Sequence, residues 1–268
     1  ISRCVVGRII AVANQKGGVG KTTTTVNLSA SLVATKRKVL VVDLDPQGNT
    51  TMGSGVNKHE LETSVYDLLV DKMPVDDIKV KTDPAGFDIV PANGDLTAAE
   101  VELIEVEGKE RRLKDALDAV KDQYDYIIID CPPSLNMLTI NAFVAADGII
   151  IPMQCEYYAL EGLSALMNTI ERIQQINPEL QIDGLLRTMY DPRSSLTTDV
   201  SSQLINHFGD KVYGTVIPRN IRLAEAPSYG LPVLCYDKTS RGAVAYLALA
   251  GEVNRKCKNL QKKAAAVS

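Results

Sequence analysis

The stretch VANQKGGVGKTTTTVN, residues 12–27, decides the fold. It has the form of a phosphate-binding loop, G-x-x-x-x-G-K-[ST], which ends here in GKT at 20–22. The first glycine of that pattern is replaced by Gln15, and a second lysine, Lys16, follows it. The loop is therefore a variant of the usual one, and its additional cation needs an explanation.

Apolar and helical patterns flank the loop in the order that a phosphate site requires. Residues 8–14, RIIAVAN, predict a buried parallel strand, and residues 22–38 predict a helix whose threonines suit its start. The glycines allow backbone N–H groups to point at phosphate oxygens, while Lys21 would reach the β- and γ-phosphates and Thr22 would coordinate Mg²⁺. The predicted nucleotide contacts are Lys16, Gly17, Gly18, Val19, Gly20, Lys21, Thr22 and Thr23.

Strand patterns alternate with helical patterns along the rest of the chain. This alternation implies βαβ units, and so an α/β P-loop fold with a doubly wound, mostly parallel sheet and helices on both faces. One ATPase domain over 1–268 is expected, with 1–7 as an N-terminal extension and 259–268 as a flexible tail. The least regular segments are 53–86 and 93–110. Further strands are expected at residues 38–45, 87–92, 124–133, 147–154, 181–190 and 212–218.

Composition narrows the function classes. The 268 residues are 45% hydrophobic and carry a net charge of −4, so bulk charge does not predict nucleic-acid binding. Five widely spaced cysteines without a CxxC pair argue against a disulfide framework or a zinc site, and fit a reducing compartment. The first residues resemble neither a signal peptide nor a membrane span.

Acidic residues end two of the predicted strands. Asp43 and Asp45 lie in VVDLDPQGNTT (41–51), and Asp130 ends the strand in YIIIDCPPS (126–134). Ligands of open α/β sheets bind at the carboxyl ends of strands. Asp130 suits a water-mediated contact with Mg²⁺, and the other two could hold a metal-bound water or orient the attacking one. A solvated acidic turn is the alternative for 43–45.

The combination KGGVGKTT, DLDPQGN and IIIDCPPS resembles the deviant Walker A ATPases, and within them the ParA/Soj chromosome- and plasmid-partitioning family. Three later segments look similar to that family too: MQCEYYALEGLSAL (153–166), TMYDPRSSL (188–196) and VIPRNIRLAEAPSYGLPV (216–233). The likeness covers nearly the whole chain. It favours the short chromosomal form over long plasmid forms with an additional N-terminal DNA-binding domain.

The resemblance assigns catalytic and nucleotide-binding roles. Lys16 matches the signature lysine that crosses an ATP-sandwich homodimer to the partner's nucleotide; the alternative is a solvated loop residue. Asp45 would position the hydrolytic water, with Asp43 supporting it or the metal. Pro218 and Asn220 match the segment that borders adenine, where an ordinary turn is the alternative.

The resemblance also implies partners. Arg193 and Arg222 match DNA-binding arginines, and the ATP-bound dimer would bind double-stranded DNA without sequence preference. The basic last helix is either part of that surface or a solvated end. A ParB-like centromere-binding protein would stimulate a slow, Mg²⁺-dependent ATP hydrolysis. The expected location is cytoplasmic and nucleoid-associated.

Two other classes share these motifs. The MinD branch uses the same ATPase core on membranes, but it needs a C-terminal amphipathic helix. Here Leu260 and Val267 are the only sizeable aliphatic residues in NRKCKNLQKKAAAVS (254–268), too little apolar area for insertion. We therefore expect no membrane role. A metabolic P-loop enzyme, such as a dethiobiotin-synthetase-like ligase or a nitrogenase-type reductase, is the remaining alternative.

Overall fold

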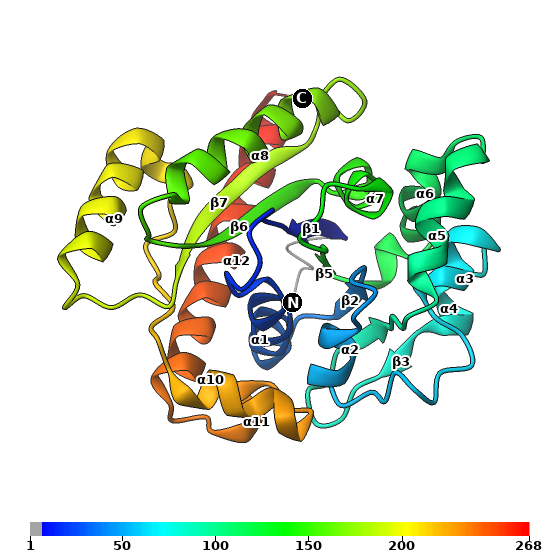
Figure 1. The fold of residues 1–268 in the computed structure, drawn as a ribbon, viewed down its shortest axis with the longest axis horizontal. Coiled ribbons are helices and arrows are strands. Elements are labelled where there is room, and N and C mark those ends of the chain that lie inside the picture. The colour runs from blue at the N-terminus through cyan, green and yellow to red at the C-terminus, as the bar shows by residue number, and fades with distance from the viewer. Residues whose placement is uncertain (1–6, 268) are drawn as a thin grey trace.

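The structure, a computed structural model, describes residues 7–267, with the side chains of 261 and 263–267 left out of the description (Figure 1). Residues 1–6 of the predicted extension therefore lie outside it. One seven-stranded sheet has the spatial order β3-β4-β2-β5-β1-β6-β7. The strands are β1 Arg8–Val12, β2 Val39–Asp43, β3 Val80–Lys81, β4 Asp88–Val90, β5 Tyr126–Asp130, β6 Gly148–Gln154 and β7 Gln181–Thr188.

Neighbouring strands pair in parallel, except that β3 runs antiparallel to β4. Helices cover both faces, which confirms the predicted doubly wound, mostly parallel α/β fold. The helices are α1 Lys21–Ala34, α2 Asn49–Gly53, α3 Val65–Val70, α4 Val75–Ile78, α5 Leu96–Glu102, α6 Arg112–Asp118, α7 Met137–Ala145, α8 Ala159–Ile173, α9 Ser195–Phe208, α10 Ile221–Glu225, α11 Val233–Tyr236 and α12 Arg241–Val267.

The alternating side chains of the strands build a separate core on each face. On one face, Ile10 and Ile128 pack with Leu28 of α1 and Leu249 of α12, and these two helices lie side by side (Figure 1). On the other, strand residues such as Ile129 pack against a layer that includes α3, α6, α7 and α8. Burial on both faces explains why the strands are nearly continuous apolar runs.

The strand predicted at 212–218 is wrong. Only isolated bridges form there, between Val212 and Leu185 and between Pro218 and Tyr190. The N–H groups of Gly214 and Thr215 donate to the Glu252 carboxylate, at 2.8 and 3.0 Å, instead of joining a ladder. The seventh strand is the two-residue β3, inside the segment that looked irregular.

The last helix is longer than the sequence suggested. Residues 259–267 continue α12, because their lysines and alanines favour helix, and the flexibility expected of this end stays a prediction. The predicted end at residue 268 lies outside the described residues.

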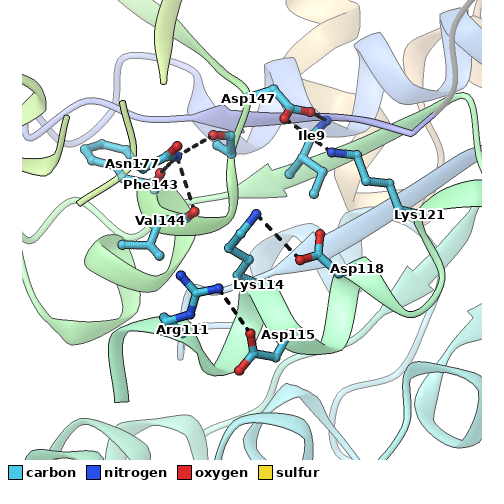
Figure 2. A network of polar contacts seen from close by, with 11 residues as sticks. Ile9, Arg111, Lys114, Asp115, Asp118, Lys121, Phe143, Val144, Asp147 and Asn177 are labelled. Atoms are coloured by element: carbon cyan, nitrogen blue, oxygen red, sulfur yellow. Dashed lines mark hydrogen bonds and ion pairs between the residues drawn. The ribbon is translucent and has the colours of Figure 1, made fainter. Parts of the chain in front are cut away.

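Polar contacts fix the edge of the sheet at which the strands begin (Figure 2). The Asn177 amide donates to the carbonyls of Phe143 and Val144, at 2.9 and 3.2 Å, and so satisfies the C-terminus of α7. The Asp147 carboxylate accepts the Ile9 N–H at 2.8 Å and pairs with Lys121 at 3.3 Å. These contacts set where β1 starts.

The register brings the three predicted motifs to the other edge. Asp130 is level with Val12, the last residue of β1, and with Asp43, the last residue of β2. The glycine loop and both acidic motifs therefore leave the sheet side by side.

Candidate functional site

The glycine loop passes from β1 into the N-terminus of α1. Gly18 and Gly20 have φ values of 73° and 90°, in the left-handed region that favours glycine. Two side chains support the loop from neighbouring strands: Thr188 Oγ1 donates to the Val19 carbonyl at 2.8 Å, and Gln154 Nε2 donates to the Gly18 carbonyl at 3.1 Å. The loop is thus held in shape by contacts with β6 and β7.

Lys21 and Thr22 begin α1 directly after the loop. The Lys21 side chain is largely buried, and its ammonium donates to the Lys16 carbonyl at 3.2 Å. Burial lowers the pKa of Lys21, although the nearby Asp130 carboxylate opposes that shift. The ammonium therefore lies within the loop, in a position to contact a phosphate group.

Asp130 joins two helices at the end of β5. Its carboxylate accepts hydrogen bonds from the hydroxyls of Thr22 at 2.8 Å, Thr50 at 2.6 Å and Thr25 at 3.2 Å. The side chain is 1% exposed, and burial raises its pKa to about 6. Hydroxyl and carboxylate oxygens are ligands that Mg²⁺ prefers, so the Thr22–Asp130 pair fits a magnesium site beside the loop.

The two acidic residues at the end of β2, Asp43 and Asp45, differ in their surroundings. Asp43 is fully buried, and its oxygens accept the Thr51 hydroxyl at 2.7 Å, the Thr51 N–H at 2.8 Å and the Asp45 N–H at 3.1 Å. Burial raises its pKa to about 7. Asp43 thus anchors α2 through Thr51, and its expected support of the water or the metal stays a prediction.

Asp45 lies at the surface of the site. Its Oδ1 accepts the Gln47 N–H at 2.9 Å, and within residues 7–267 its Oδ2 has no hydrogen-bond partner. The side chain lines the cavity over the glycine loop, so one carboxylate oxygen is available there.

Two adjoining cavities share Gly20, Thr23 and Met189. The larger, of about 600 Å³, also contains Lys21 and Asp45 in its lining. The smaller, of about 190 Å³, is lined by further residues including Pro218, Asn220, Leu223 and Tyr246. A larger cavity on the loop, lined by Lys21 and Asp45, beside a smaller, mainly apolar one matches the shape of a triphosphate followed by a base.

Pro218 and Asn220 are therefore brought to the same site as the glycine loop. The Asn220 side-chain oxygen accepts the Leu223 N–H at 3.3 Å and caps α10. Any contact with a base would fall to its amide nitrogen, and that role stays a prediction.

Lys16 is not directed at the loop's own cavity. Its ammonium lies 2.5 Å from Glu156 Oε2, in the segment between β6 and α8, and both side chains are about half exposed. Its backbone N–H donates to the Asn14 side chain at 3.0 Å. The lysine is thus on the outer surface of the site, while Lys21 fills the inner position.

The two predicted DNA-binding arginines carry acidic partners. Arg193 pairs with Asp191 at 2.8 Å, and this pairing lowers the pKa of Asp191 to about 2. Arg222 pairs with Glu225 at 2.7 Å and Asp237 at 3.5 Å. The Tyr190–Pro218 bridge joins the two segments that carry the arginines, although each charge is locally balanced.

Lys256 of α12 is turned toward the fold, whereas Arg255, Lys258 and Lys262, spaced i, i+3 and i+7, lie on one face of the helix. The Lys256 ammonium donates to the carbonyls of Asp183 and Asp210, at 3.2 and 3.0 Å, and lies 4.2 Å from the Tyr213 ring centroid. It therefore stabilises the fold. Arg255, Lys258 and Lys262 are exposed, and the Lys263 side chain lies outside the description.

Several residues of the site were not predicted from the sequence. Thr25 and Thr50 hold Asp130, Thr51 holds Asp43, and Glu156 holds Lys16. The only sequence signal for the threonines is their run in KTTTT and GNTT. The preference of threonine for the start of a helix already explains that run. Nothing in the sequence pairs Glu156 with the loop.

Residues 7–267 contain neither a cluster of metal-binding side chains nor a helix that could span a membrane. No group of three or more His, Cys, Asp and Glu side chains is arranged to hold a metal ion, so the hydroxyl–carboxylate pair is the metal candidate there. Across the same residues, no helix combines the length and apolar character needed to cross a bilayer.

Comparison with known proteins gives matches over most of the chain. Residues 7–182 match a protein family described as an AAA domain. The sporulation initiation inhibitor protein Soj of Bacillus subtilis is 56% identical over 248 residues, covering 92% of this chain and 98% of its own length. An uncharacterized protein of Pseudomonas putida is 67% identical over 250 residues, covering 93% and 95% of the two chains.

Solved structures also match. A Mycobacterium smegmatis protein described as cobyrinic acid a,c-diamide synthase, with bound ATP analog and magnesium, superimposes with a TM-score of 0.81. It is 40% identical, and the match covers 92% of this chain and 93% of that one.

Proposed function

The chain belongs to the ParA/Soj family of partitioning ATPases, and on that premise we propose that it is a DNA-segregation ATPase driven by ATP and Mg²⁺. ATP binding drives dimerisation and binding to double-stranded DNA, and hydrolysis reverses both. The observation that carries the ATPase part is the 2.8 Å contact between the Thr22 hydroxyl and the Asp130 carboxylate, beside Lys21.

ATP would occupy the two adjoining cavities. The N–H groups of the glycine loop and the Lys21 ammonium bind phosphate oxygens, because both present positive charge inside the loop. Mg²⁺ would be held by Thr22 directly and by Asp130 through water, and it supplies neutralisation of the β- and γ-phosphate charge. Pro218 and Asn220 border the adenine.

Hydrolysis depends on Asp45 in this proposal. Its Oδ2 can accept a proton of the attacking water and orient that water toward the γ-phosphate. Asp43 keeps this turn in place through Thr51 and the Asp45 N–H. With one carboxylate acting alone, slow intrinsic turnover is expected.

Dimerisation gives Lys16 its role. Lys21 already supplies a cation to the nucleotide in its own subunit, so a second lysine acts best on the nucleotide of another copy. Lys16 from each subunit would reach the partner's ATP and neutralise charge that develops between its β- and γ-phosphates. The lysine must first leave Glu156, an exposed partner that competes only weakly.

DNA binding would use Arg193 and Arg222 on the dimer. Their contacts go to phosphates, so affinity should be independent of sequence and fall steeply with salt. DNA phosphates must replace Asp191 and Glu225 as partners of these arginines. A ParB-like centromere-binding protein would stimulate hydrolysis and release, at the nucleoid in the cytoplasm.

One experiment tests the whole proposal. DNA binding of the Asp45→Ala protein is measured with ATP, ADP or no nucleotide over a salt series, while sizing of the same samples reports dimers. DNA binding only with ATP, in step with dimer formation and weakened by salt, supports the proposal. An ATP dimer that ignores DNA at low salt would keep ATP-driven dimerisation and overturn the DNA partner, leaving a small-molecule substrate or a lipid surface to test.

A further inference from the structure

A basic pocket lies at the N-terminal ends of the parallel strands, whereas the glycine loop lies at their C-terminal ends. It is bordered by residues that precede β2 and β5, where these strands begin, and has a volume of about 540 Å³. Its lining includes Arg37, Lys38, Lys79, Lys81, Asp88 and Tyr124. Four cations around one cavity are unexpected in a chain whose net charge is −4.

Two of the four cations are already paired. Lys79 lies 2.5 Å from Asp76, and Lys81 lies 3.4 Å from Asp88. The Asp88 carboxylate also accepts the Tyr124 hydroxyl at 2.8 Å, so it is fully engaged. The pocket's acidic groups therefore leave the other two cations uncompensated.

Arg37 and Lys38 are those remaining cations. Among residues 7–267, neither side chain has a carboxylate within 4.0 Å. The Arg37 Nε is buried, and no acceptor within the described chain bonds to it. Because Nε is enclosed by the protein, an anion in the cavity would instead contact the remaining guanidinium nitrogens of Arg37, which make no hydrogen bond within the described residues.

The backbone holds these two residues in a fixed turn. Lys36 has a φ of 64°, and the N–H groups of Lys36 and Arg37 bond to the carbonyls of Val33 and Leu32, at 2.8 and 3.1 Å. Glycine is the usual residue at such a left-handed helix end. The turn therefore carries a run of three cations, KRK, on a rigid part of the fold.

We propose that this pocket binds a phosphate group, carried either by a free phosphorylated molecule or by a nucleic-acid backbone. The planar guanidinium of Arg37 matches the geometry of phosphate oxygens, and the ammonium groups of Lys38, Lys79 and Lys81 add charge around it. This site is independent of the ATP site, because it lies at the other edge of the sheet.

The test is an NMR titration of the full chain with inorganic phosphate while the ATP site is saturated with Mg²⁺ and ADP. Saturable shifts of the backbone amides at 37–38 and 79–81 are expected. Arg37→Gln should weaken phosphate binding about tenfold, the loss expected for one charge-assisted hydrogen-bonding group. Lys38→Gln, at an exposed position, is a second variant should the first fold poorly.

A short DNA duplex distinguishes the two sources. Competition between duplex and phosphate for the same amides identifies a nucleic-acid backbone, and phosphate binding that the duplex leaves unchanged identifies a free phosphorylated molecule. Absence of saturable shifts with both probes would overturn the proposal.

Lys36→Asn is the matched control. It removes the same charge from the same turn, Asn tolerates the left-handed conformation, and Lys36 does not line the pocket. Its phosphate affinity should stay within about twofold, the effect of a distant screened charge. Equal losses in Lys36→Asn and Arg37→Gln would show a general surface-charge effect. A lower melting temperature of Arg37→Gln with unchanged phosphate affinity would show that the cation only stabilises the end of α1. Both results would overturn the site.

Discussion

The Lys16 ammonium is bound to Glu156 of its own chain, at 2.5 Å. This ion pair ties the glycine loop to the segment after β6. Because both side chains are about half exposed, it contributes only about 0–1 kcal/mol. A phosphate group from a second subunit could therefore displace Glu156 at little cost.

Glu156→Gln should favour dimers. The change removes the competing carboxylate, so the protein concentration needed for ATP-driven dimerisation should fall up to about fivefold. Sizing at several protein concentrations with ATP measures this, and ATP affinity of the monomer is the control. A dimerisation curve that matches the parent's would mean that Glu156 does not restrain Lys16.

Lys21→Ala should lose nucleotide binding. It removes the buried ammonium inside the loop, and ATP affinity should fall at least about a hundredfold. The variant loses a charge-assisted contact with phosphate, and it leaves the space of the lysine side chain empty. Equilibrium binding of a fluorescent ATP analogue reports the affinity. Lys16→Ala should bind ATP as a monomer much as the parent does, and equal losses in the two variants would contradict their separate roles.

Asp45→Ala should bind ATP and remain a dimer. Its turnover should fall about a hundredfold or more because the water loses its orienting group. Asp43→Ala should affect stability instead. It leaves the Thr51 N–H without an acceptor and should lower the free energy of unfolding by about 1–3 kcal/mol. ATPase rates and urea unfolding of both variants check this. Normal turnover of Asp45→Ala would place the water-orienting role elsewhere.

Asp130 should make the nucleotide-free protein less stable as pH rises. Burial raises its pKa to about 6, from an ordinary value of 3.8. Between these values the native state binds more protons than the unfolded state, so the free energy of unfolding falls with increasing pH. Asp130→Asn cannot titrate and should lose less stability between about pH 4 and about pH 7, by up to about 3 kcal/mol. Urea unfolding at both pH values measures the difference, and parallel losses in parent and variant would contradict it.

DNA binding through Arg222 should depend on the charge of its acidic neighbour, Glu225. Arg222→Glu should retain ATP-driven dimerisation and lose DNA binding, whereas Glu225→Gln should remove the nearer of the arginine's two acidic partners and raise DNA affinity several-fold at low salt. Each affinity is measured at equal salt. If neither change alters DNA affinity, the phosphate contacts lie on another surface.

The fold could be predicted largely because apolar runs and glycine loops are local signals. The apolar runs that form β1, β2, β5 and β6 are each bounded by charged or polar residues. In a parallel sheet, the motifs that follow these strands meet at the carboxyl ends of the strands. β3 was missed because a strand of two residues is too short to show an alternating hydrophobic pattern. The segment at 212–218 looked like a strand, although the Glu252 carboxylate takes two of its N–H groups.

The site could be predicted in composition but not in its internal contacts. The expected residues of the loop do meet Asp130, because α1 starts beside the end of β5. Whether a carboxylate faces the cavity or lies buried depends on side-chain packing across distant elements. Asp43 and Asp45 are two residues apart in sequence, yet only the second reaches the cavity, since Thr51 of α2 takes the first.

The place of β1 in the sheet has a consequence for synthesis of the protein. β1 carries the glycine loop and pairs only with β5 and β6, which emerge from the ribosome long after it, once β2 through α6 have been made. Contacts between such distant segments form slowly and late. The nucleotide loop is thus translated before both strands that hold β1, and β1 cannot pair with β5 until residues 126–130 have left the exit tunnel. ATP therefore cannot stabilise the nascent chain through this site before β5 has emerged.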